Sequence, residues 1–125
     1  MRFYKRAQLC SATLALAFDG RGLGAFDDLD QLTLFADNLV PHVLWCDGIL
    51  RYAPALEAAI EQGALLEPGG AEEVELRAVA VTAVERLTAR IGAPNAMAID
   101  NALWERGQEP GYEARPRPRV RTTAF

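Results

Sequence analysis

A single carboxylate, Asp37, lies within an otherwise largely apolar stretch, residues 33–41 (TLFADNLVP). An ionised carboxylate in a dry interior costs several kcal/mol or more unless it is paired or solvated. In a partly desolvated cleft it stabilises a developing positive charge better than it would in water, because the local dielectric is low. Asp37 is therefore a candidate catalytic acid. The alternative is a helix-end residue whose carboxylate caps the following turn, and spacing alone leaves both interpretations open.

A second group of polar residues lies near the end of the chain, in the segment IDNALWE at residues 99–105. On a helix, Asp100 pairs with Trp104 and Asn101 with Glu105 at a spacing of four, so these side chains project to adjoining faces. Such a group suits a ligand with hydroxyl or ammonium groups, because carboxylates accept hydrogen bonds from both. The alternative is a solvated helix face with Trp104 in the core.

Basic residues form two further groups. Lys5 and Arg6 lie near the start, and four arginines alternate with other residues in the tail: Arg115, Arg117, Arg119 and Arg121. Clustered arginines bind phosphate through bidentate contacts, but alternating Pro and Arg is also typical of a solvated terminus.

Other motifs favour structural roles. His42 follows a proline in a short predicted helix, where a lone histidine is more often structural than catalytic. The two cysteines, Cys10 and Cys46, have neither zinc spacing nor a disulfide framework, so we predict buried, reduced thiols and no metal site. The glycine loop at residues 20–24 follows a predicted helix rather than a strand, which argues against a dinucleotide-binding motif.

Composition limits the classes of function. The chain has 125 residues, half of them hydrophobic, as expected for one globular domain. Its net charge of -4, from 13 basic and 17 acidic residues, argues against stable nucleic-acid binding. No apolar run approaches the ~20 residues of a membrane span, and no signal-peptide cleavage site is apparent, so we expect a cytoplasmic protein.

Hydrophobic periodicity and helix-end signals predict an all-α fold with an extended tail that begins near Arg115 and is compatible with a strand. The first helix, over residues 3–18, is predicted to be mostly buried, because apolar and small side chains run nearly throughout it. The other predicted helices cover Asp27 or Asp28 to about Asp37, Pro41 to Leu50, Pro54 to about Gln62, Ala71 to Ile91, and Pro94 to Arg106.

Several motifs together resemble the queuosine salvage protein family, in order and in approximate spacing. They are YKRAQ at residues 4–8, GLG at 22–24, FDD at 26–28, LTLFAD at 32–37, VP at 40–41, LRY at 50–52, EVELR at 73–77 and LW at 103–104. The resemblance implies a helical fold akin to the helix-hairpin-helix DNA glycosylases. It also implies hydrolysis of the N-glycosidic bond of queuosine 5'-phosphate, without a cofactor, to release queuine for reuse in tRNA.

The resemblance also implies roles for individual residues. Asp37 matches the family's catalytic acid, with Phe35 and Ala36 beside the bound base. A second binding segment around the queuine matches Asp100, Asn101 and Glu105. Asn101 replaces the usual aromatic residue, and Glu105 stands where Asp is usual.

The implied chemistry fits these residue types. Cleavage of a ribose N-glycosidic bond builds oxocarbenium character on the sugar, which Asp37 can stabilise while orienting the attacking water. Asp100 and Glu105 can accept hydrogen bonds from the diol or the ammonium group of queuine, so a base without the diol would leave acids unpaired. Lys5 or Arg6 can bind the 5'-phosphate.

Family members are much longer than this sequence, which matches their carboxyl-terminal, catalytic portion over residues 1–125. We therefore expect exposed apolar surface on the first helix, where the amino-terminal portion of the family is missing. A partner chain that supplies this portion is one expectation. The alternative function is an incomplete helical module that binds queuine or a partner chain without cleavage, and DNA glycosylase activity fits the net acidity poorly.

Overall fold

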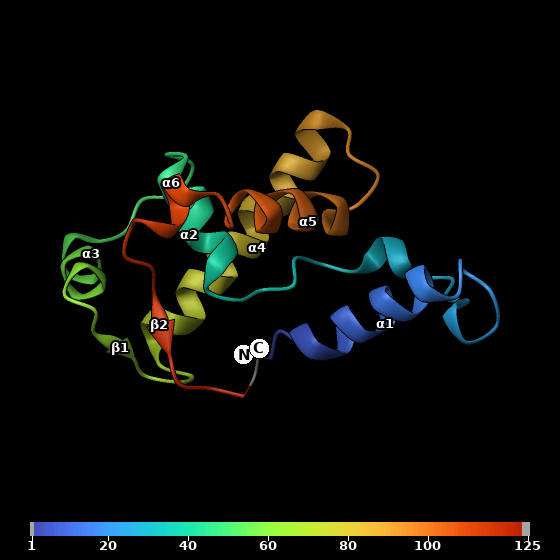
Figure 1. Ribbon diagram of the computed structural model, residues 1–125, viewed down its shortest axis with the longest axis horizontal. Helices are drawn as coiled ribbons and strands as arrows, with labels where there is room; N and C mark the ends of the chain where they lie inside the picture. The colour runs from blue at the N-terminus through green and yellow to red at the C-terminus, as the bar shows by residue number, and fades with distance from the viewer. Residues whose placement is uncertain (1, 124–125) are drawn as a thin grey trace.

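The computed structural model describes residues 2–123 and is mostly helical (Figure 1). Two short 3-10 turns and two two-residue strands complete it. In chain order the elements are α1 (Lys5–Ala17), η1 (Gly22–Gly24), η2 (Leu29–Gln31), α2 (Leu39–Cys46), α3 (Pro54–Glu61), β1 (Leu65–Leu66), α4 (Ala71–Ile91), α5 (Ala96–Arg106), α6 (Pro110–Glu113) and β2 (Arg119–Val120).

The core surrounds α2, which packs against α4, α5 and α6 (Figure 1). Six consecutive residues of α2, Leu39–Leu44, are buried, and five of them are apolar, as is typical of a helix at the centre of a core. Ala80 and Val84 of α4 and Leu103 of α5 complete the centre of the core. Asp37 lies two residues before α2, so the packing of α2 holds it at the edge of this core.

The boundaries predicted for α4 are confirmed. Acidic Glu72 and Glu73 occupy its first turn and Arg90 its last, which suits the helix dipole. Gly92 ends the helix with a left-handed φ of 68°, a conformation that glycine adopts without steric cost. The predicted α3 is also confirmed, with Pro54 in its first turn.

The helix predicted to end at about Asp37 is wrong. Only η2 is helical in that region, and residues 32–37 belong to no helix or strand. The cause is tertiary, because side chains from distant elements bond the backbone there: Gln8 Oε1 accepts from the Thr33 amide at 2.8 Å. The helix predicted from Pro41 to Leu50 begins earlier, at Leu39, and ends at Cys46.

Helix α1 lies to one side of the other helices, at right in Figure 1. The prediction that this helix is mostly buried is wrong. Only Ala12 and Ala15 of α1 are buried. Leu9, Leu16 and the following Phe18 are 43%, 71% and 45% exposed. The apolar composition of this segment therefore does not serve the core of this chain, and the expected exposed apolar surface on this helix is confirmed.

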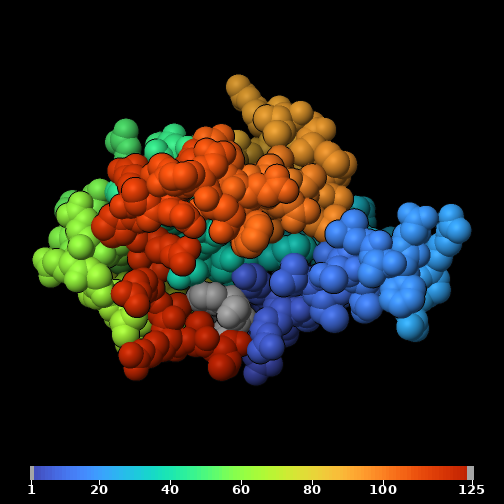
Figure 2. Space-filling view, viewed as in Figure 1, coloured from blue at the N-terminus to red at the C-terminus, as the bar shows by residue number. Residues whose placement is uncertain are grey.

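The tail returns to the middle of the chain. Strands β1 and β2 pair in parallel, with Leu65 opposite Arg119 and Leu66 opposite Val120. Figure 2 shows the red tail beside the green segment that leads to β1. The sequence pattern predicted neither β1 nor α6, because two-residue and four-residue elements carry too little periodicity.

Both cysteines are free thiols, but the predicted burial is wrong for Cys10, which is exposed on α1. Cys46 is partly buried at the end of α2. Within residues 2–123, no helix combines the length and the apolar character that a membrane span requires.

Candidate functional site

Asp37 is 6% exposed, and both of its carboxylate oxygens have partners. Oδ2 forms an ion pair with Lys5 Nζ at 2.8 Å. Oδ1 accepts hydrogen bonds from the Leu39 and Val40 amides, at 2.8 and 3.1 Å. The capping interpretation of Asp37 is therefore confirmed, because its carboxylate caps the first turn of α2, and the same carboxylate also forms an ion pair with a lysine in α1.

We define the acid segment as residues 34–37, which end in Asp37. Asp100 Oδ1 accepts from the Phe35 amide at 3.1 Å, and Arg77 Nε donates to the Ala36 carbonyl at 3.0 Å. The Ala36 amide donates to the Leu34 carbonyl at 2.8 Å, which makes a tight local turn. Each backbone bond from α4 and α5 restricts the segment, so the position of Asp37 is set by several elements together.

Asp100 is buried, with 5% exposure, so the alternative of a solvated face is wrong for this residue. Burial raises the pKa of its carboxyl group to about 7, and the charge of Asp37 adds to this rise. The Phe35 amide and the charge of Lys5 act in the opposite direction on the same pKa. Asp100 therefore titrates near neutral pH, where it can serve as either a hydrogen-bond donor or an acceptor.

Asn101 and Glu105 are exposed, unlike Asp100. They lie four residues apart on one face of α5, and that face is turned away from the acid segment that Asp100 contacts. Trp104 is 50% exposed, so the alternative that placed it in the core is wrong for this residue. Of the three residues in the second predicted segment, only Asp100 is bonded to the acid segment.

Sequence reasoning missed a second buried ion pair beside the acid segment. Arg77 Nη1 bonds Glu73 Oε1 at 2.8 Å, and both side chains are less than a tenth exposed. The Arg77 guanidinium also lies 4.2 Å from the centre of the Phe3 ring. The sequence contains a signal for this ion pair, because the motif EVELR places Glu73 and Arg77 four residues apart on a predicted helix.

His42 is buried in α2 and contacts α6. It is 1% exposed, and its Nε2 is 2.9 Å from the Tyr112 carbonyl oxygen of α6. Burial lowers the pKa of His42, although the bond to Tyr112 opposes this shift. The contact ties α2 to α6. Within residues 2–123, no group of three or more His, Cys, Asp or Glu side chains is arranged to hold a metal ion.

The basic residues near the start take different partners. Lys5 is committed to Asp37 through the ion pair described above. Arg6 Nη1 donates to the Thr123 carbonyl at 3.2 Å, which links α1 to the tail. In the tail, the Arg115 guanidinium lies 4.3 Å from the centre of the Trp45 ring.

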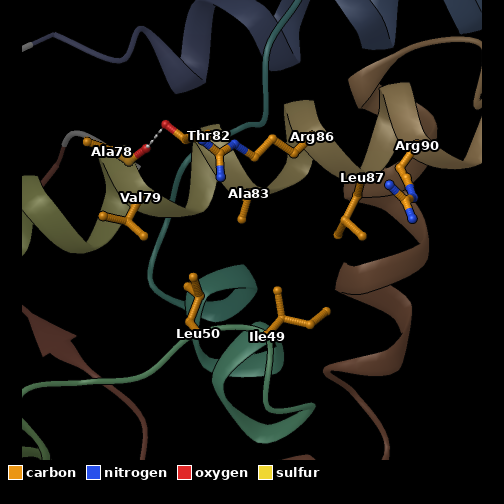
Figure 3. A pocket seen from close by; sticks show the side chains of 9 residues that line it. All are labelled: Ile49, Leu50, Ala78, Val79, Thr82, Ala83, Arg86, Leu87 and Arg90. Atoms are coloured by element: carbon orange, nitrogen blue, oxygen red, sulfur yellow. Dashed lines mark hydrogen bonds between the residues drawn. The ribbon is translucent and has the colours of Figure 1, made fainter.

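Two hollows differ sharply in their relation to Asp37. The crevice that Asp37 lines, with Arg77 and Arg119 among its neighbours, has a volume of about 10 Å³, enough for about one water molecule. A hollow of about 560 Å³ opens between α4 and the turn after α2 (Figure 3). It has an apolar floor with Arg86 and Arg90 along α4, and none of the predicted site residues lines it.

Comparison with known proteins adds an independent finding. The profile of the family described as "Queuosine salvage protein" matches residues 1–125. A protein of Sphaerobacter thermophilus named queuosine 5'-phosphate N-glycosylase/hydrolase is 47% identical over 129 residues, which cover 100% of this chain. Relatives with the same name occur in Dictyostelium discoideum, 41% identical over 85% of the chain, and in Mus musculus, 32% identical over 86%.

The matched regions are only part of each relative. They span 40% of the Sphaerobacter protein, 34% of the Dictyostelium protein and 35% of the mouse protein. The match to the family nevertheless extends over all 125 residues and includes the acid segment. The chain belongs to the queuosine salvage protein family.

Proposed function

We propose that residues 1–125 form the carboxyl-terminal, catalytic portion of a hydrolase that releases queuine from queuosine 5'-phosphate. The observation that carries this proposal is the arrangement of Asp37, a buried carboxylate held by Lys5 and by two amides of α2. The names of the relatives support the substrate and the bond that is cleaved.

In the proposed reaction, the bond between the anomeric carbon and the base nitrogen breaks. The electron pair leaves with the base, which takes up a proton, and water supplies a hydroxyl group to the anomeric carbon. Asp37 stabilises the positive charge that develops on the ribose and orients the water. Lys5 compensates the charge of Asp37 before substrate binds and holds Oδ2 in place. The products are queuine and ribose 5-phosphate.

The acid segment and Asp100 are the proposed contacts to the base. Phe35 and Ala36 are only 3% and 0% exposed as whole residues, so contacts from them to the base stay predictions. Asp100 can accept from, or donate to, the diol or the ammonium group of queuine because its pKa lies near 7. Two further sets of contacts stay predictions: those from Asn101 and Glu105 to queuine, and those from Lys5 or Arg6 to the 5'-phosphate.

A site of full size needs more surface than these residues supply. The crevice at Asp37 holds about 10 Å³, far less than a nucleotide needs, and α1 exposes Leu9 and Leu16. We therefore include in the proposal further polypeptide, corresponding to the rest of the relatives, that packs on α1 and completes the pocket. Three statements remain predictions: that this polypeptide is a partner chain, that the fold is like that of the helix-hairpin-helix glycosylases, and that the protein is cytoplasmic.

The decisive experiment measures queuine released from queuosine 5'-phosphate by the wild-type chain and by Asp37→Asn. The amide oxygen of the substituted side chain retains an acceptor for Leu39 and Val40, whereas the negative charge is lost. We expect a loss of activity of about 100-fold or more. Asp30→Asn is the matched control, because it removes an exposed carboxylate from η2 and should leave release unchanged.

Queuine release that survives in Asp37→Asn would overturn the role of Asp37. A folded wild-type chain that binds queuine but releases none, both alone and with the remaining polypeptide of a relative, would instead support the binding module.

A further inference from the structure

A hollow with an unusual concentration of arginine lies beside the acid segment. We define the arginine hollow by the residues that line it: Asn38, Gly63, Leu65, Arg117, Arg119, Val120 and Arg121. Its volume is about 380 Å³, much larger than that of the crevice at Asp37. Three of its seven lining residues are arginines and none is acidic, so its lining is positively charged.

The alternation of the tail explains why three arginines meet there. Successive side chains of extended chain point to opposite sides, so Arg117, Arg119 and Arg121 share one side. Pro118 and Val120, between them, are buried and half-buried. Pairing of β2 with β1 holds this register, with Arg119 opposite Leu65.

These arginines have no ion pair with a carboxylate among residues 2–123. All three are exposed, and their like charges repel one another. A bound anion would relieve this repulsion, and the planar guanidinium group fits the oxygens of phosphate in a bidentate arrangement. Gly63 leaves room for such a ligand, because a Cβ built there has no atom within 4 Å.

Two contacts connect the arginine hollow to Asp37. Asn38, the next residue along the chain, donates from Nδ2 to the Pro118 carbonyl at 2.7 Å. Arg119 lines both the arginine hollow and the crevice at Asp37. A nucleotide with its anomeric carbon at Asp37 would carry its phosphate one ribose and one methylene group away, and the arginine hollow adjoins the crevice at Asp37 through Asn38, Arg119 and Val120.

We infer that the arginine hollow binds a sugar phosphomonoester, the 5'-phosphate of the nucleotide substrate and of the ribose 5-phosphate product. This inference rests on the proposed function for the identity of the sugar. It assigns the phosphate to the tail arginines rather than to Lys5, whose ammonium group is paired with Asp37.

The test is direct binding, measured by isothermal titration calorimetry of the whole chain with ribose 5-phosphate and with unphosphorylated ribose. We expect saturable binding of ribose 5-phosphate and none of ribose. A loss of one charge-assisted contact in Arg119→Gln or Arg117→Gln should weaken binding by about tenfold or more. Arg90→Gln, which removes an exposed arginine from α4, is the matched control and should bind like wild type.

A second measurement locates the ligand. In nitrogen-15 NMR spectra, the side-chain amide of Asn38 should shift on addition of ribose 5-phosphate, because this amide bonds the strand that carries the arginines. A folded wild-type chain that fails to bind ribose 5-phosphate would overturn the inference. Equal binding of ribose 5-phosphate by wild type, Arg117→Gln and Arg119→Gln would also overturn it. So would an RNA oligonucleotide that binds through these arginines and thereby prevents ribose 5-phosphate from binding.

Failure of this inference can be told apart from failure of the proposed function. A chain that releases queuine but does not distinguish ribose 5-phosphate from ribose disproves only the phosphate site. A chain that binds ribose 5-phosphate through Arg119 but never releases queuine disproves only the proposed reaction.

Discussion

Asp37 and Asp100 are buried carboxyl groups that approach the same four-residue segment from different elements. Asp37 has Lys5 as a counter-ion, and the charge of Asp37 disfavours ionisation of Asp100. The two acids therefore differ in their surroundings: Asp37 is paired with a lysine, and Asp100 has a pKa of about 7. A difference of this kind is common where one acid must stay ionised and another must exchange a proton.

The raised pKa of Asp100 predicts how stability depends on pH. An aspartate in an unfolded chain titrates near pH 4, so between about pH 4 and 7 the folded chain holds a proton that the unfolded chain has lost. The contribution of Asp100 to stability therefore falls as the pH rises through this range, by up to about 4 kcal/mol.

Asp100→Asn should remove this dependence, because its amide oxygen still accepts from the Phe35 amide and carries no charge. Urea denaturation at pH 5 and pH 8 should show that wild type loses more stability than Asp100→Asn at the higher pH. Equal losses in the two proteins would contradict the assignment of the raised pKa to Asp100.

Among single residues, the sequence pattern selected Asp37 and Asp100 as candidates, but it could not show which way their neighbours on the helix face. The apolar surroundings of Asp37 in the chain correctly indicated a partnered acid. For α5, a spacing of four shows which residues share a face but not which face turns inward. Asp100 and the exposed pair Asn101 and Glu105 are distinguished only by the packing of α5 on α2.

Among the elements, α4 and the acid segment show where local pattern is sufficient and where it is not. The ends of α4 are determined by residues next to them, such as Gly92, so its boundaries could be predicted. The acid segment has a helix-compatible composition, yet its backbone is bonded by Arg77 and Asp100, at sequence separations of 41 and 65 residues. No local pattern contains that information.

Arg77→Ala should be strongly destabilising. Removal of the guanidinium leaves the buried Glu73 carboxylate without its ion-pair partner and removes the donor to the Ala36 carbonyl. We expect a loss of about 3 to 5 kcal/mol in the free energy of unfolding, measured by urea denaturation. Arg86→Ala on the same helix is exposed and should change stability by less than about 0.5 kcal/mol.

Gly107→Ala should disturb the junction between α5 and α2. A Cβ at this position would lie 2.9 to 3.1 Å from three carbon atoms of Leu39, the first residue of α2. The expected cost is about 1 to 3 kcal/mol, measured by thermal or urea denaturation. Gly111→Ala provides the comparison, because a Cβ there meets nothing within 4 Å; similar losses in both variants would argue against the contact with Leu39.

For the molecule as a whole, the exposed apolar face of α1 is the feature with the largest expected effect on behaviour in solution. Leu9 and Leu16 on this helix, and Phe18 directly after it, are exposed, and the same helix supplies Lys5 to Asp37. Apolar side chains that gather on one element, rather than singly, are typical of an interaction surface.

We predict that the isolated chain self-associates through this face at high concentration. Leu16→Glu should abolish the association in sedimentation velocity experiments and change the free energy of unfolding by less than about 0.5 kcal/mol. Ile91→Glu, at the end of α4 and 64% exposed, should leave the association intact. An association that persists in Leu16→Glu would place the contact elsewhere.

The acid segment and Asn38 also have a consequence for the order of folding. Their side-chain bonds to Lys5, Arg77, Asp100 and Pro118 span 32, 41, 65 and 80 residues of chain. Contacts of such separation form late, after their loops have been closed. The Phe35 amide should therefore exchange with deuterium only when the entire chain unfolds, which makes this one proton a reporter of how often the completed site is lost.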